Sequence, residues 1–189
     1  MAHEVSYAEQ TFDSPNPITR FAHRSRYRIS LDLSDRLLPR GGLMVDFGAG
    51  QGTFLDMLGQ RRADARLLAI EPFMTILHPE VSQVADLGAV APGTVDLIGS
   101  FEVLEHVADA DLAAFLGDAE RALKPDGVLL VTVPIMYGPV LPIKEVAAAL
   151  LHRRWITHGP GELIRASLGI PIARPEQRGN THKGFDFRW

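Results

Sequence analysis

The stretch Val45–Thr53, which reads VDFGAGQGT, decides the fold of this chain. It joins an apolar run at Leu43–Phe47 to a segment at Thr53–Gln60 whose apolar residues recur at helical spacing. Glycines at three alternate positions allow a tight turn and let backbone N–H groups approach a ligand where the helix begins. The pattern predicts a strand, a glycine-rich turn and a helix, the first unit of a nucleotide-binding α/β sheet. A tight turn that binds nothing is the alternative.

Apolar runs and helical spacings alternate along the rest of the chain. Further strands are expected at Arg66–Glu71, Val81–Asp86, Val95–Phe101 and Val128–Val133. Helices are expected at Ile18–Leu38, Phe73–His78, Asp109–Leu123, Lys144–Trp155 and Glu162–Ser167, with a short extended piece at Ile170–Ala173. Strands that are apolar along their whole length are typical of a parallel sheet covered by helices on both faces. The predicted fold class is therefore α/β, a doubly wound Rossmann-like sheet.

Length and composition indicate one globular domain of ordinary make-up. The 189 residues are 46% hydrophobic, carry a net charge of −4 and include no cysteine, which excludes disulfides and a cysteine nucleophile. An acidic middle segment between mildly basic ends is not typical of a protein that binds duplex nucleic acid. The N-terminal residues lack the pattern of a signal peptide, and prolines interrupt the longest apolar stretch, 128–143. We therefore expect no transmembrane segment and a cytoplasmic location.

Two acidic residues indicate what the glycine turn binds. Asp46 lies at the entry of the turn, where it would repel a diphosphate and attract an ammonium group. Glu71 ends the second predicted strand, where a carboxylate can accept hydrogen bonds from both hydroxyls of a ribose. Thr53 stands where the dinucleotide motif has its third glycine. The site is thus predicted to take a ribose and a cation rather than a diphosphate.

These motifs resemble those of the class I S-adenosylmethionine-dependent methyltransferases over Leu43–Pro134. Ser100–Val107 (SFEVLEHV) is similar to the motif of the family's fourth strand, and Leu123–Gly127 (LKPDG) to the turn before its fifth. The resemblance implies that Asp46 and the glycine turn bind the methionine part of S-adenosylmethionine, Glu71 its ribose and Asp86 its adenine. The implied cofactor-binding residues are Asp46, Gly48, Ala49, Gly50, Gly52, Glu71, Pro72, Asp86, Leu87 and Phe101.

The string Glu102–His106 (EVLEH) supplies candidates for catalysis and for a metal site. If this segment is helical, Glu102, Glu105 and His106 share one face, and their side chains suit Mg²⁺, Mn²⁺ or Zn²⁺. The string resembles metal-assisted O-methyltransferases of the ubiquinone-biosynthesis and small-RNA 2′-hydroxyl types, and the former imply His182 as a further ligand. If the string binds no metal, Glu102 is expected to line the pocket. Glu105 would then cap a helix or form an ion pair, and His106 would pack against neighbouring side chains or act as a general base. Glu102 and His106 are the predicted catalytic residues.

The regions that flank the cofactor core are predicted to serve the acceptor. The resemblance implies that residues 1–189 form a single methyltransferase domain, divided into a helical lid (1–40), the cofactor-binding core (41–135), and an acceptor-side insertion with the start of a C-terminal part (136–189). Arg20, Arg24 and Arg28 recur at i, i+4 and i+8. They either meet an anionic acceptor or form a solvated face. The resemblance implies direct in-line transfer to a small-molecule, sugar-linked or lipid-linked acceptor, with oxygen as the acceptor atom.

Two other functions stay open at this point. One is an NAD-dependent oxidoreductase on a similar sheet, and the other is a non-catalytic interaction protein with a degenerate cofactor site. The second arises because the family's sheet has seven strands and only five are recognised here. The C-terminal strands are expected to be missing, which would leave an apolar sheet edge exposed unless a homodimer partner covers it.

Overall fold

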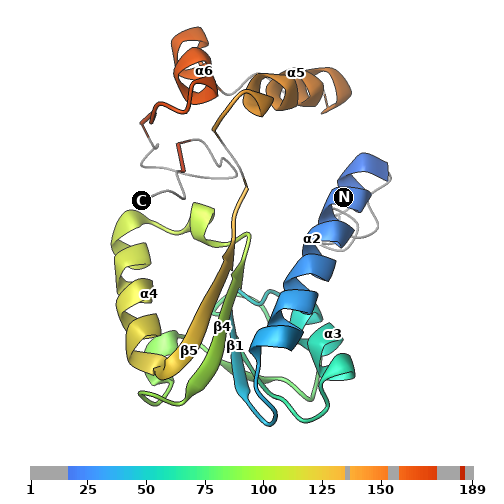
Figure 1. Cartoon of the computed structure of the whole chain (residues 1–189), viewed down its shortest axis with the longest axis vertical. Coiled ribbons are helices and arrows are strands. Elements are labelled where there is room, and N and C mark those ends of the chain that lie inside the picture. Colours follow the sequence, from blue (N-terminus) through green and yellow to red (C-terminus); the bar gives the residue numbers. More distant parts are fainter. Residues whose placement is uncertain (1–16, 135–136, 153–157, 174–183, 186–189) are drawn as a thin grey trace, which may run out of the picture. The chain divides into compact units, whose positions relative to one another are not determined.

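The computed structural model of the chain describes residues 17–134, 137–152, 158–173 and 184–185 (Figure 1). The chain falls into two compact units. The sheet unit consists of Met1–Phe101 and Phe115–Val131, and the helical unit consists of Glu102–Ala114 and Thr132–Trp189. Among the described residues, no helix is both long enough and apolar enough to cross a membrane.

The described part of the sheet unit is built on five strands in the order β3-β2-β1-β4-β5. β1 pairs in parallel with β2 and with β4, and β2 pairs in parallel with β3. The chain order reverses at β1, which is where ligands of open α/β sheets bind, beyond the carboxyl ends of the strands. The predicted doubly wound, Rossmann-like sheet is confirmed. The strands are β1 Leu43–Phe47, β2 Arg66–Ile70, β3 Ser82–Val84, β4 Val95–Phe101 and β5 Leu123–Thr132.

Helices pack on both faces of this sheet (Figure 1). α2 (Pro17–Leu37) and α3 (Thr53–Arg61) lie on one face. The part of α4 (Asp109–Ala122) that belongs to the sheet unit lies on the other, where the ring centroids of Phe47 and Phe115 are 4.3 Å apart. Each such apolar side chain contributes about 1.5–3 kcal/mol when fully buried. The core under α2 and α3 includes Leu31, Met44, Leu55, Leu58 and Leu97.

Arg62, at the end of α3, anchors the C-terminal half of α2. Its guanidinium donates to the backbone carbonyls of Leu38 at 2.8 Å and Pro39 at 2.9 Å, and it pairs with the carboxylate of Asp64 at 2.9 Å. The bonds to Leu38 and Pro39 supply donors to carbonyl groups that have no hydrogen-bond partner within the helix. A surface hollow of about 850 Å³ is lined by Arg62 and Asp64. It lies at the amino end of β1, away from the glycine turn.

The expected positions of β1 and β4 are confirmed to the residue, whereas the helix expected at Phe73–His78 is wrong. The N–H groups of Phe73 and Met74 donate to the Glu71 side chain, and that of Leu77 donates to the Gln51 carbonyl at 3.1 Å. Because these donors bond to the Glu71 side chain and to the Gln51 carbonyl instead of to carbonyls four residues earlier, the segment forms a non-helical loop.

β5 begins at Leu123, earlier than the expected Val128, so the turn predicted at 124–127 lies inside the strand. The ammonium group of Lys124 contacts the Asp96 carboxylate at 2.6 Å and holds this end of β5 beside the start of β4. In the part of the chain that the structure describes, β5 forms one edge of a five-stranded sheet, and residues 127–132 are half-buried. The homodimer that would cover this edge stays a prediction.

The described part of the helical unit contains a 3₁₀ turn at Leu104–His106, the first residues of α4, and the helices α5 (Val140–His152) and α6 (Pro160–Ser167). Side chains of Tyr137, Leu141 and Ala166 form its small core. α5 begins four residues before the helix expected from the sequence, and Trp155 lies outside the described residues. The piece expected to be extended, 170–173, joins no strand, and the Ile172 N–H donates to the Tyr137 hydroxyl.

Candidate cofactor site

The turn after β1 depends on glycine at three positions. Gly48, Gly50 and Gly52 have φ values of 79°, 57° and 86°, in the left-handed region that residues with a Cβ rarely adopt. A Cβ on Gly52 would also lie 2.9 Å from the Ile76 side chain, whereas nothing lies within 4 Å of a Cβ on Gly50. The turn is therefore packed on one side and open at Gly50, where a ligand can approach the backbone.

Glu71 clamps this turn from the end of β2. One carboxylate oxygen, Oε2, accepts the N–H of Gly50 at 2.9 Å, and Oε1 accepts the N–H groups of Phe73 at 2.8 Å and Met74 at 3.2 Å. The side chain is only 7% exposed. Because a carboxylate has about four acceptor sites, Oε2 retains capacity for one further donor. One ribose hydroxyl can therefore bond to Glu71 without any change in the loop.

Asp46 is a buried carboxyl next to the glycine turn, with 3% of its surface exposed. Burial, together with repulsion by the nearby Glu71 carboxylate, raises its pKa to about 7. Burial disfavours the charged form because the interior solvates an anion poorly. An added cation would reverse that preference. The position is therefore suited to a ligand with an ammonium group.

The segment after β3 is shaped by Asp86, whose carboxylate accepts the N–H of Ala89 at 3.1 Å, while Leu87 is buried. Arg121, on α4, holds the same segment by donating to the carbonyls of Leu87 at 3.0 Å and Val90 at 2.7 Å. Sequence reasoning missed Arg121, because no local pattern links a helix residue to a loop more than thirty positions earlier.

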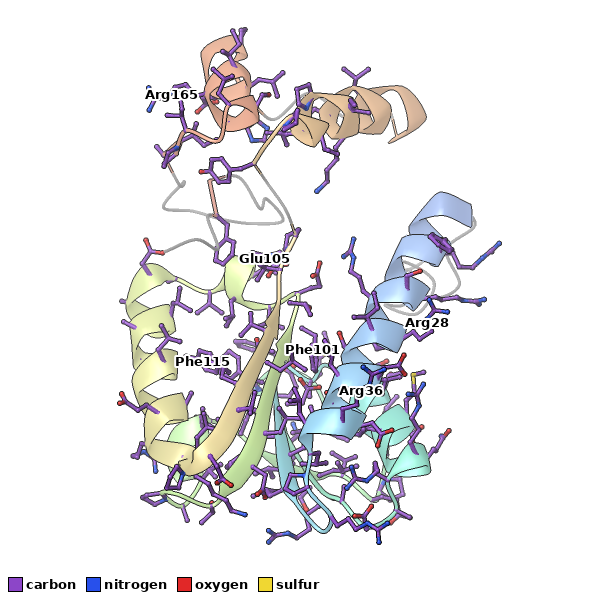
Figure 2. All side chains as sticks on the ribbon, viewed as in Figure 1. Arg28, Arg36, Phe101, Glu105, Phe115 and Arg165 are labelled. Atoms are coloured by element: carbon purple, nitrogen blue, oxygen red, sulfur yellow. The ribbon has the colours of Figure 1, made fainter. Side chains whose placement is uncertain are left out.

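Phe101 ends β4 and packs on α3, where its ring centroid lies 4.2 Å from that of Phe54. Tyr27 of α2 extends the row, with its ring 6.0 Å from that of Phe54. Of these three aromatic residues, Phe101 is labelled in Figure 2. The absence of a side chain at Gly99 makes room for Phe101, because a Cβ there would lie 2.7 Å from the Phe101 ring and 2.8 Å from Met44 Cε. Gly99 therefore sets the position of the Phe101 ring.

We expect Gly99→Ala to lower the free energy of unfolding by about 1–3 kcal/mol, since overpacking a tight core forces neighbours out of place. Urea unfolding would measure the change. Gly117→Ala is the matched control, because nothing lies within 4 Å of a Cβ at this exposed helical position. The control should stabilise slightly. Equal effects of the two substitutions would contradict the packing argument.

The condition for a shared helical face at Glu102–His106, an α-helix over this segment, is not met. Glu102 has a φ of 58°, the only positive φ among the described residues other than glycine, and its N–H donates to the Thr132 carbonyl at 2.9 Å. The next residues form a 3₁₀ turn, in which Glu105 is buried and His106 is exposed. Because Glu102 precedes that turn in a left-handed conformation, the three side chains do not project from one α-helical face. Such backbone strain is concentrated at functional sites.

The structure divides the predicted site residues between the two units. All ten predicted cofactor-binding residues belong to the sheet unit, whereas Glu102, Glu105 and His106 belong to the helical unit. Within residues 17–134, 137–152, 158–173 and 184–185, no group of three or more acidic or histidine side chains could hold a metal ion. The predicted ligand His182 lies outside those residues. The metal site stays a prediction that no geometry supports.

Comparison with known proteins agrees with the fold and the motifs. Residues 21–184 match the model of a family described as a methyltransferase domain. The chain is 27% identical over 167 residues to the ubiquinone biosynthesis O-methyltransferase of Rhodopseudomonas palustris (strain BisB5), covering 77% of this chain and 64% of that protein. It is 33% identical over 121 residues to the trans-aconitate 2-methyltransferase of Azoarcus sp. (strain BH72), covering 59% and 47%.

Among solved structures, a putative S-adenosylmethionine-dependent methyltransferase from Methanococcus maripaludis superposes with a TM-score of 0.52 at 17% identity, covering 70% of this chain and 66% of that one. This likeness shows the fold. The chain spans about 64% of the length of the ubiquinone-type relative. The comparisons do not favour the oxidoreductase or the non-catalytic alternative. The chain belongs to the methyltransferase-domain family and has the Rossmann-like fold of the class I S-adenosylmethionine-dependent methyltransferases.

Proposed function

We propose that the chain transfers a methyl group from S-adenosylmethionine to a hydroxyl oxygen of a small-molecule, sugar-linked or lipid-linked acceptor. The observation that carries the proposal is the pair of buried carboxylates, Asp46 and Glu71, beside a glycine turn at the carboxyl end of the sheet. One suits an ammonium group and the other a ribose hydroxyl. The family match and the name of the ubiquinone-type relative support methyl transfer to oxygen.

The residues of the sheet unit fit this cofactor. Gly50 has open space where a side chain would be, so the ligand can approach the turn closely. Asp86 keeps acceptor capacity for the adenine amino group after bonding to Ala89, and Leu87 offers an apolar contact beside it. Phe101 presents a half-buried ring at the end of β4. These groups cover the methionine, ribose and adenine parts of one ligand.

When bound, the cofactor supplies an electrophilic methyl group on a sulfonium, whose sulfur leaves as a neutral thioether. The main task of the protein is therefore to hold the acceptor oxygen in line with that methyl group and to exclude water. A hydroxyl acceptor must also lose its proton. In the proposal, an imidazole nitrogen of His106 receives this proton, and the Glu102 carboxylate orients the acceptor.

Calorimetric titration with S-adenosylhomocysteine tests the cofactor site. We expect a dissociation constant of roughly 1–10 µM, an affinity near −7 to −8 kcal/mol, and no binding of NAD⁺ under the same conditions. A folded chain that binds NAD⁺ and not S-adenosylhomocysteine would overturn the proposal. A screen of phenols, carboxylic acids and sugars, with formation of S-adenosylhomocysteine as readout, follows. Repeating it with EDTA tests the predicted need for Mg²⁺.

We expect His106→Ala to lower kcat on the best acceptor of that screen by about 10²-fold or more, since a general base contributes this much. The affinity for S-adenosylhomocysteine should stay within about twofold, because His106 is not among the cofactor-binding residues. Glu120→Ala, an exposed position on α4, is the control for nonspecific effects. An unchanged kcat with the same pH profile as the original protein would exclude His106 as the base.

A further inference from the structure

The loop that follows Glu71, residues 72–78, is held mainly by hydrogen bonds rather than by burial of its apolar side chains. Phe73, Met74 and Leu77 leave 92%, 48% and 64% of their surfaces open to solvent. Apolar side chains that stay exposed add little hydrophobic stabilisation. Ile76 is half-buried and lies against Gly52. The conformation of this loop therefore depends strongly on the groups that bond to its backbone.

Gln83, in the middle of β3, bonds to this loop at three places. Its side-chain amide nitrogen donates to the backbone carbonyls of Glu71 and Met74, at 2.7 Å each. Its amide oxygen accepts the N–H of Ile76 at 3.3 Å. The nitrogen thus faces two acceptors and the oxygen faces a donor. Glutamine matches these three backbone groups, whereas a carboxylate of the same length has no donor for the two carbonyls.

β3 also holds the backbone of Glu71 on both sides. The Glu71 N–H donates to the Val84 carbonyl at 3.3 Å, and the Glu71 carbonyl accepts from the Gln83 amide. The side-chain rotamers open to a residue depend on its backbone conformation. Bonds that fix the Glu71 backbone therefore also restrict where its carboxylate lies.

We propose that Gln83 is a positioning residue for cofactor binding, which holds loop 72–78 so that the Glu71 carboxylate is directed at the ribose hydroxyls of S-adenosylmethionine. This inference rests on the proposed function and adds to it a residue that acts through Glu71. Both residues belong to the sheet unit. A loop that is already held in its binding conformation loses less freedom when the ligand binds, and the affinity is higher for that reason.

Replacing Gln83 by methionine tests the proposal, because methionine keeps the length of the side chain and removes its hydrogen bonds. Gln83 is exposed, so the substitution leaves the core closed. The control is Gln60→Met. Gln60 is an exposed glutamine on α3, and its amide donates to Asp56 one turn earlier at 2.9 Å.

Two ligands are titrated by calorimetry into the full chain and into each variant. One is S-adenosylhomocysteine, and the other is its 2′,3′-dideoxy analogue, which lacks both ribose hydroxyls. Comparing a residue change with the removal of a ligand group forms a cycle that isolates the coupling between the two. Urea unfolding of each protein without ligand measures its stability.

We expect Gln83→Met to bind S-adenosylhomocysteine about tenfold more weakly than the original chain, since three hydrogen bonds to the loop are lost. The dideoxy analogue lacks the groups that Glu71 would bind, so its affinity should fall less than about threefold. Gln60→Met should bind both ligands as the original chain does. Gln83→Glu, which keeps an acceptor for Ile76 but no donor, should lose at least as much affinity as Gln83→Met.

Equal affinity of Gln83→Met and the original chain for S-adenosylhomocysteine would overturn the inference. An equal loss for both ligands would also overturn it, because a general loss of structure does not depend on the ribose hydroxyls. Normal binding by Gln83→Glu would show that the two donated bonds have no role. If the folded original chain binds neither ligand, the proposed function fails, and the inference that rests on it fails too.

Discussion

Replacing Glu71 by alanine is expected to weaken binding of S-adenosylhomocysteine by about 100-fold, close to 2.7 kcal/mol. The substitution removes the acceptor for a ribose hydroxyl and also the acceptor for three backbone N–H groups that shape the turn. A single hydrogen bond to a charged group contributes about 1.5–3 kcal/mol, and leaving buried donors without an acceptor costs a similar amount. Calorimetric titration measures the loss directly.

Two further variants separate the proposed contact of Glu71 with the ribose from its hydrogen bonds to the backbone of the turn and loop. Glu71→Gln keeps one carbonyl oxygen and replaces the other with a donor, so it should weaken binding by an intermediate amount. Glu80→Ala removes an exposed carboxylate after the same loop and should leave the affinity unchanged within about twofold. If Glu71→Ala unfolds at the same urea concentration as the original chain and still binds normally, neither role of Glu71 is correct.

Binding of the cofactor product is expected to release a proton from Asp46 near pH 6.5. In the free protein, burial and the Glu71 carboxylate hold the pKa of Asp46 at about 7, so the carboxyl is mostly protonated there. The ammonium group of the ligand favours the carboxylate and lowers that pKa. Affinity should therefore rise up to about tenfold per pH unit below pH 7 and level off above it. Titrations in two buffers with different ionisation enthalpies measure the released proton.

The same residue gives a pH dependence of stability with a defined sign. The folded state retains a proton on Asp46 between about pH 4 and pH 7, whereas the unfolded state has lost it. The folded state therefore binds more protons than the unfolded state between about pH 4 and pH 7. The contribution of Asp46 to the free energy of unfolding falls as the pH rises through this range. Urea unfolding at several pH values would show a shallower fall for Asp46→Asn.

Asp46→Asn should also weaken binding and abolish the proton release. Asp126→Asn, at an exposed position in β5, is the matched control and should change neither property. Binding of S-adenosylhomocysteine that is independent of pH between 5 and 7 in the original chain would contradict the placement of an ammonium group at Asp46.

The sequence by itself determined the sheet and the glycine turn after its first strand. β1 and β4 were predicted to the residue, because each is an apolar run that a glycine turn or a charged string follows at once. The glycines at 48, 50 and 52 were predicted as a close-approach turn, and all three have positive φ. Periodicity and glycine conformation are local properties, so the order of residues alone specifies them.

Only the tertiary structure decided the hydrogen bonds of Glu71, the pKa of Asp46 and the backbone conformation of Glu102. Glu71 bonds to the turn 21 positions earlier, and the resulting loop replaces the helix expected at Phe73–His78. The raised pKa of Asp46 arises from burial and from repulsion by the Glu71 carboxylate, 25 positions later in the sequence. The left-handed Glu102, bonded to Thr132, removes the helical face on which the metal prediction depended. Each outcome depends on contacts between residues distant in sequence, whose energies exceed the local preferences of the segments involved.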